Sequence, residues 1–136
     1  MTIRQKALED ARVALAKILN VLNQQNDILE QMQQQYSSIV KESENNLFQD
    51  DFNPSFAINY SSYLNRLSQD IKTQELIIRK TKEDLARQQE IAKDAYIKVK
   101  SLEKLKEKQK EEYNKLLQQE EFKLIDDIVN SKRIAI

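Results

Sequence analysis

The chain contains no glycine and only one proline, Pro54, so its sequence offers a single strong interruption to helical structure. Proline has no amide hydrogen and disfavours a helical conformation in the residue before it, but it fits the first turn of a helix. Asn53 is therefore the predicted N-cap of a helix that begins at Pro54. Because helix-compatible sequence runs away from this point in both directions, we predict a helical hairpin.

The composition is polar for a compact globular domain, with 32% charged residues and a mean hydropathy of −0.73. Such values also accompany intrinsic disorder. The apolar residues nevertheless recur at helical spacing over long windows, which favours folded helices. We predict an all-α fold in which residues 1–136 form a single antiparallel coiled-coil hairpin. Its helices are expected at about 2–45 and 54–131, joined by a turn at about 46–53, with the second helix longer and overhanging.

Apolar residues repeat every seven positions along both predicted helices, which is the pattern of a coiled-coil seam. In the first helix the two rows are Leu8, Leu15, Leu22, Leu29, Tyr36 and Ala11, Ile18, Gln25, Met32, Ile39. In the second helix they are Tyr60, Leu67, Gln74, Thr81, Gln88, Ala95, Leu102 and Leu64, Ile71, Ile78, Leu85, Ala92, Val99. A further row, Ala7, Ala14, Val21 and Ile28, indicates either a second partner or the ordinary breadth of an amphipathic helix.

Folding the helices together about the turn predicts their register. Leu22 comes near Ile77, and Gln25 comes near Gln74. Two seam amides that hydrogen-bond to each other would fix the register at some cost in stability. At the other end, Thr2 and Gln5 have the spacing of a capping box, so the first helix is expected to begin at about residue 2.

The second predicted helix exceeds the first by roughly 50 Å at 1.5 Å per residue. This overhang still contains apolar residues, namely Leu102, Leu105, Tyr113, Leu116, Leu117, Phe122, Leu124, Ile125, Ile128 and Val129. A lone helix gains little by exposing such side chains, so we predict a surface for another protein molecule. The alternative is a bent or frayed tail.

Charge gives no sign of nucleic-acid binding, because the formal net charge is zero. Residues 1–60 carry five Lys/Arg and eight Asp/Glu, a net −3, and residues 61–136 carry 17 and 14, a net +3, which mildly favours antiparallel pairing. The lysines between 98 and 110 alternate with acids, and pairs such as Glu83 with Arg87 have favourable i,i+4 spacing. We interpret this as a solvated face. No segment is apolar enough for a signal core or a membrane span, so we expect a soluble, unsecreted protein.

The residues of common catalytic chemistry are missing. Without histidine or cysteine, the usual general base, thiolate nucleophile and zinc sites are excluded, and without glycine there is no phosphate-binding loop. The adjacent acids Asp50 with Asp51 and Asp126 with Asp127 fit solvated turn or capping roles, because nothing would desolvate them. We therefore expect no enzyme, no cofactor and no metal.

Three segments have recognisable patterns. Residues 58–67, after the predicted turn, read Ile-Asn-Tyr-Ser-Ser-Tyr-Leu-Asn-Arg-Leu, residues 102–108 contain Leu-Glu-Lys-Leu, and residues 122–128 contain Lys-Leu-Ile-Asp-Asp. In this order they resemble the Asn-Tyr-x-x-aromatic-x-x-x-Leu segment, the Leu-Glu-Lys-Leu run and the terminal Lys-x-aliphatic-Asp-acidic element of the FliJ family of flagellar export proteins. The chain departs from the family at Asp70, where alanine is frequent, and on the first helix, where Tyr36 is the one aromatic residue.

The resemblance implies a cytoplasmic, non-enzymatic export component at the inner face of the cell membrane, similar to the central stalk of a rotary ATPase. The implied partners are the export ATPase hexamer, the export-gate membrane protein and export chaperones, with no nucleic acid and with membrane association through partners alone. The implied ATPase contacts, together with the N-terminal turns, are Leu116, Leu117, Phe122, Leu124, Ile125 and Ile128. The implied gate contacts are Tyr36, Tyr60, Tyr63 and Leu67.

Three other functions fit a helical hairpin. A stalk protein of a virulence secretion system would share the fold and differ in its partners. A self-associating structural coiled coil would use the overhang for its own copies. A chaperone of the prefoldin type needs β-strands between its helices, and residues 47–53 are too few for them.

Overall fold

The computed structural model describes residues 1–48 and 53–134, and this part of the chain forms two helices, α1 (Ile3–Leu47) and α2 (Pro54–Ile134). Their 45 and 81 residues correspond to about 68 Å and about 120 Å of helix. The predicted all-α antiparallel hairpin is confirmed: the second helix begins at Pro54 as expected, and the other three helix ends lie one to three residues from those expected. Residues 49–52 of the predicted turn lie outside the described residues.

Both helices begin where the sequence predicts a cap. The Thr2 amide donates to Gln5 Oε1 at 2.9 Å and the Gln5 amide donates to Thr2 Oγ1 at 3.1 Å, which are the two bonds of a capping box. Asn53 Oδ1 accepts from the Ser55 amide at 3.0 Å and from its hydroxyl at 2.7 Å. Pro54 occupies the first helical position, where its missing amide hydrogen costs nothing.

The chain divides into two compact units: Glu9–Lys93, the hairpin unit, and Met1–Leu8 with Asp94–Ile136, the overhang unit. The single domain inferred from the sequence stays a prediction.

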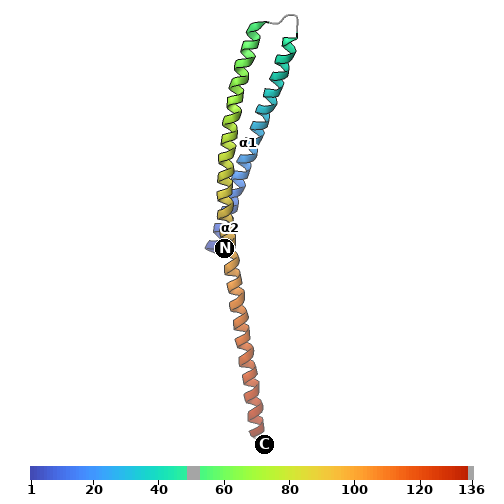
Figure 1. Ribbon diagram of the computed structural model, residues 1–136. Coiled ribbons are helices and arrows are strands. Elements are labelled where there is room, and N and C mark those ends of the chain that lie inside the picture. The colour runs from blue at the N-terminus through green and yellow to red at the C-terminus, as the bar shows by residue number, and fades with distance from the viewer. Residues whose placement is uncertain (49–52, 135–136) are drawn as a thin grey trace. The chain divides into compact units, whose positions relative to one another are not determined.

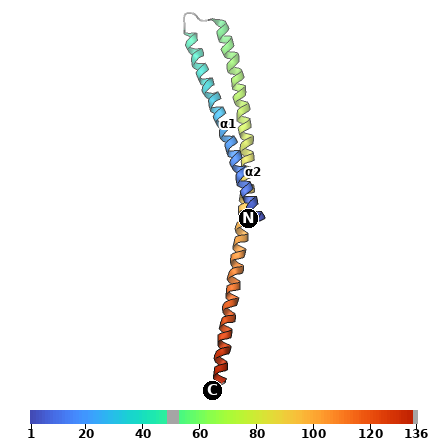
Figure 2. The same cartoon turned by 180° about the vertical axis from the view of Figure 1, so that it is seen from behind.

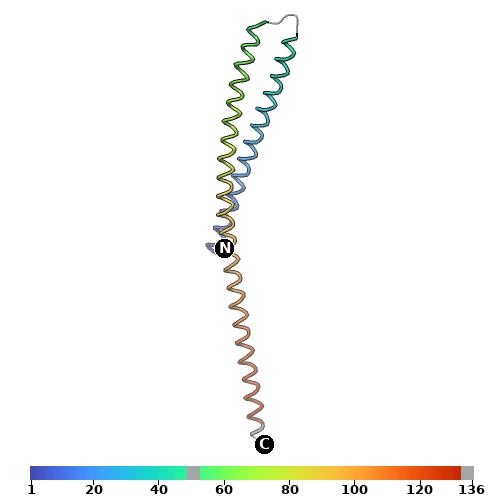
Figure 3. Tube along the Cα trace, in the orientation of Figure 1, coloured from blue at the N-terminus to red at the C-terminus, as the bar shows by residue number. Residues whose placement is uncertain are grey.

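Within the hairpin unit, α1 and α2 lie side by side and run in opposite directions (Figures 1 and 2). Their register is defined by two hydrogen bonds. Gln74 Nε2 donates to the Gln25 carbonyl at 3.0 Å, and Gln88 Nε2 donates to the Ala11 carbonyl at 3.3 Å. The segment from Ala11 to Gln25 on α1 therefore lies beside the segment from Gln88 back to Gln74 on α2. Figure 3 shows the two antiparallel helix traces. The predicted height of Gln25 and Gln74 is confirmed.

The detail of this polar layer differs from the prediction. Gln74 bonds the main-chain carbonyl of Gln25 instead of its side chain, and Gln25 Oε1 is buried with no hydrogen-bond partner among the described residues. The long glutamine side chain crosses the narrow seam and reaches the facing backbone, so the two amide groups do not meet.

The seam is thin but matches the predicted rows. Within the hairpin unit every predicted row member except Tyr36 is buried or half-buried, and Ala11, Leu67 and Ile78 are the most buried apolar residues. The further row behaves differently, because Val21 and Ile28 are exposed. A two-helix seam therefore accounts for two rows, whereas in the third row Ala14 is half-buried and the larger Val21 and Ile28 stay exposed inside this unit.

In the overhang unit the first turns of α1 lie against α2. Arg4 Nη1 donates to the Lys98 carbonyl at 3.5 Å, and Val99 is buried. From residue 103 to residue 132 every side chain is exposed. The apolar residues of this stretch therefore find no cover within the unit.

One predicted ion pair is wrong. Arg87 bonds to Asp84, three residues before it, and not to Glu83. Both acids lie within one helical turn of Arg87, so either could reach it, and the structure selects the nearer one.

Candidate partner-binding surfaces

The residues that the structure describes hold no cluster of three or more His, Cys, Asp or Glu side chains that could bind a metal. Across residues 1–48 and 53–134, neither helix has a stretch long and apolar enough to span a membrane. Exposed apolar and aromatic side chains gather in two places along the helices.

The first surface, the connection patch, consists of Tyr36, Tyr60, Tyr63 and Leu67. Its members differ sharply in exposure, since Tyr63 is 43% exposed and Leu67 only 7%. Tyr60 is half-buried in the seam. Leu67 thus supports the patch from beneath, and Tyr63 and Tyr36 present the accessible surface.

Hydrogen bonds hold the two tyrosines of α2 in place. Gln35 Nε2 donates to the Tyr63 hydroxyl at 2.7 Å, and Asn46 Nδ2 donates to the Tyr60 hydroxyl at 2.8 Å. Burial, and then the negative charge of Glu42, raise the pKa of Tyr60 above its usual value of 10.0. The phenol therefore stays protonated at neutral pH and serves as a polar anchor between the helices.

A shallow cavity of about 390 Å³ opens beside these tyrosines, lined by Ile39, Phe56, Asn59, Tyr60 and Tyr63. The sequence reasoning missed Phe56, which is exposed in the first turn of α2. Phe56 could have been predicted from the sequence as a contact residue. It is a large aromatic residue outside both seam rows, so it has no packing role in a two-helix hairpin. The cavity extends the connection patch with an apolar pocket suited to one inserted side chain.

The second surface, the overhang patch, consists of Leu116, Leu117, Phe122, Leu124, Ile125 and Ile128. These side chains are 41% to 68% exposed. At about 100° per residue, Leu117, Leu124 and Ile128 share one face of α2, and Phe122 lies nearly opposite. A helix that is apolar on more than one face is typical of an element enclosed by other protein.

The comparison with protein families decides the assignment: a family model described as flagellar FliJ protein matches residues 1–134. The chain belongs to the FliJ family. It is thus a protein related to flagellar export, and members of the family are non-enzymatic export components. Comparisons with the curated proteins and with the solved structures found no match. The recognition made from residues 58–67, 102–108 and 122–128 is confirmed.

Proposed function

We propose that this FliJ-family chain is a stalk-like coupling component that links the export ATPase ring to the membrane export gate and escorts export chaperones. The observation that supports it best is the overhang patch. Its six side chains are exposed on more than one face of a single helix. A channel through the middle of a ring would cover all these faces at once, whereas a flat partner surface would cover only one.

The connection patch supports the second half of the proposal. It combines an apolar cavity with tyrosines whose hydroxyls are held by Gln35 and Asn46. Tyrosines fixed in this way bring large contact area at low entropic cost, as is common where proteins bind tightly. We assign this patch to the export gate, and we place the protein at the cytoplasmic face of the membrane through that partner.

Chaperone escort rests on the resemblance to the family. The flagellar family match favours this system over a virulence secretion system.

The proposal is tested by co-purification with the export ATPase. The double variant Phe122→Ala and Ile125→Ala should weaken ATPase binding about tenfold or more and reduce the stimulation of ring assembly, because it removes two large apolar contacts from one side of α2. Alanine is a strong helix former and both side chains are exposed, so α2 should stay intact.

Leu76→Ala is the matched control, because Leu76 is equally exposed but lies in the hairpin unit. It should leave ATPase binding unchanged. Equal ATPase affinity of the double variant and the parent would contradict the assignment of the overhang patch.

A further inference from the structure

One flank of the hairpin unit is mostly apolar, although Asp70 and Asp84 occupy two positions of its α2 row. We define the apolar flank as Val21 and Ile28 of α1 with Ile77 and Ile91 of α2, whose side chains are 42% to 54% exposed. Each of the four residues directly precedes a seam residue in the sequence. Val21 and Ile28 are one heptad apart on α1, and Ile77 and Ile91 are two heptads apart on α2. Gln35 lies one heptad after Ile28, and Tyr63 lies two heptads before Ile77. Because Gln35 and Tyr63 are hydrogen-bonded to each other, the two rows are neighbours across the hairpin.

The opposite flank is polar. Its equivalent positions on α1 hold Arg12, Leu19, Asn26, Gln33 and Val40, and those on α2 hold Ser61, Ser68, Glu75, Lys82 and Gln89. Leu19 and Val40 are the apolar side chains in this set, and Val40 is half-buried. The difference between the flanks excludes general amphipathic breadth as the reason for the apolar one, because that would widen both flanks alike.

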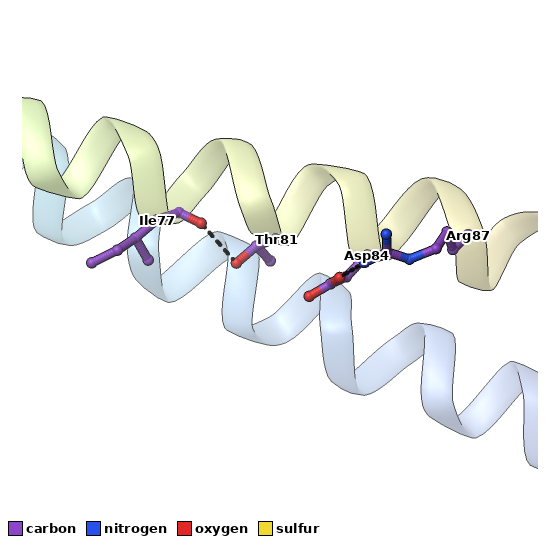
Figure 4. Close-up of polar contacts among 4 residues, drawn as sticks. All are labelled: Ile77, Thr81, Asp84 and Arg87. Carbon is purple, nitrogen blue, oxygen red and sulfur yellow. Dashed lines mark hydrogen bonds and ion pairs between the residues drawn. The ribbon is translucent and has the colours of Figure 1, made fainter.

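The apolar flank contains a groove of about 470 Å³ between the two helices. Ile18, Val21 and Ile91 line it together with Thr81. The Thr81 hydroxyl donates to the Ile77 carbonyl at 3.1 Å, so its polar group is already used within α2 (Figure 4). The groove therefore has a mostly apolar floor. Its lining on α2 extends from Thr81 to Ile91, which is about three helical turns.

The rim of the groove is positively charged. Lys17 stands on the α1 side and Arg87 on the α2 side. Asp84 is the carboxylate of the lining, and Arg87 already bonds it (Figure 4). Lys80 lies one heptad before Arg87 and so on the same face of α2. Because Arg87 and Asp84 neutralise each other, Lys17 on α1 and Lys80 on α2 supply the positive excess, against Asp10 one heptad before Lys17.

We propose that this groove binds an acidic amphipathic helix of another protein, which packs as a third helix along the hairpin. Aliphatic side chains at heptad spacing would fill the groove, and flanking Asp or Glu side chains would meet Lys17, Lys80 and Arg87. A second copy of this chain fits less well, because the same flank would bring cations against cations. This site is separate from the connection patch and the overhang patch, and it does not depend on the function proposed for them.

The test uses the full chain and a synthetic helical peptide of three heptads, with Leu at the apolar positions and Glu at the flanking ones. Fluorescence anisotropy follows the labelled peptide at a concentration too low for it to associate with itself. The Glu peptide should bind in the micromolar range at low salt and lose affinity as salt rises. A peptide with Lys in place of every Glu should bind at least about tenfold more weakly.

Two pairs of neighbouring substitutions locate the site. Val21→Ser and Ile77→Ser should each weaken binding about tenfold, and Leu19→Ser and Leu76→Ser should not, because Leu19 is about as exposed as Val21 and Leu76 is more exposed than Ile77 but both lie off the flank. Lys17→Gln with Arg87→Gln should abolish the preference for Glu over Lys peptide. The proposal is overturned by equal binding of the two peptides, by equal losses in the matched pairs, or by no binding of the Glu peptide. A dimer mass in light scattering that Val21→Ser removes would assign the flank to a second copy instead.

Discussion

Tyr63 lies at the edge of the seam and is nevertheless tied to the facing helix by a side-chain hydrogen bond. Its ring is exposed, and its hydroxyl accepts a hydrogen bond from Gln35 across the hairpin. The neighbouring Tyr60 and Leu67 lie deeper, one half-buried and one buried. A partner that contacts this surface therefore meets Tyr63 first, and the cost of ordering the side chain has already been met within the hairpin.

Tyr63→Ala should accordingly lower the affinity for the export-gate protein about tenfold, because it removes an ordered aromatic contact. Helicity by circular dichroism should not change, since the residue lies outside the two seam rows. Tyr96→Ala is the matched control, because Tyr96 is a similarly exposed tyrosine of the overhang unit. If both variants bound the gate protein like the parent, Tyr63 would have no role in gate recognition.

At this scale the sequence predicted local geometry well. Asn53 before Pro54, and Thr2 with Gln5, were recognisable as caps because capping depends on side chains within a few residues. The acceptor of Gln74 was not predictable in the same way. Seven-residue spacing brings Gln25 and Gln74 to one height, but the choice between a side-chain and a main-chain acceptor depends on how closely the helices approach.

Polar seam layers define the character of the hairpin as an element. Gln74, Thr81 and Gln88 occupy three successive positions of one row, and each donates to a main-chain carbonyl. Gln74 and Gln88 bond across the seam, whereas Thr81 bonds within α2. Such layers favour one register because a slipped pairing would leave buried amides without partners, and they weaken the seam because amides are costly to desolvate.

Gln74→Leu should therefore stabilise the hairpin by about 1 kcal/mol, which corresponds to a rise in Tm of about 4 °C. Gln74 is 8% exposed, so leucine would replace a buried amide with apolar contact against Ile71 and Ile78 of the same seam. Thermal unfolding followed by circular dichroism measures the change. Gln74→Ala is the control, because it removes the amide without filling the seam and should lower Tm. A fall in Tm for Gln74→Leu would mean that the bond to the Gln25 carbonyl outweighs the desolvation cost.

The elements themselves were predictable because seven-residue periodicity and the absence of glycine act over long stretches. The rows containing Leu22 and Ile78 were assigned correctly, and burial follows them throughout the hairpin unit. The apolar flank was left open between two interpretations. Only the register shows that Val21 and Ile77 belong to adjoining rows on one side, and periodicity within each helix does not contain that information.

For the whole molecule, the two proposed coupling functions fall in different compact units. The connection patch belongs to Glu9–Lys93, and the overhang patch belongs to the unit that contains Asp94–Ile136. Residues 103–132 are all exposed, so their side chains do not bury any part of the hairpin seam. Binding at one patch should therefore survive loss of the other.

Removal of residues 117–136 should abolish binding to the export ATPase and leave gate binding within about twofold of the full chain, because sites in separate units behave nearly additively. The thermal transition of the hairpin should stay within a few degrees of the parent's, since the deleted side chains bury no seam residue. Pull-down with each partner and circular dichroism on the same preparation measure all three quantities. Loss of gate binding with an unchanged thermal transition would show that the gate contact extends into the overhang, and unchanged ATPase binding would move that contact to the N-terminal turns of α1.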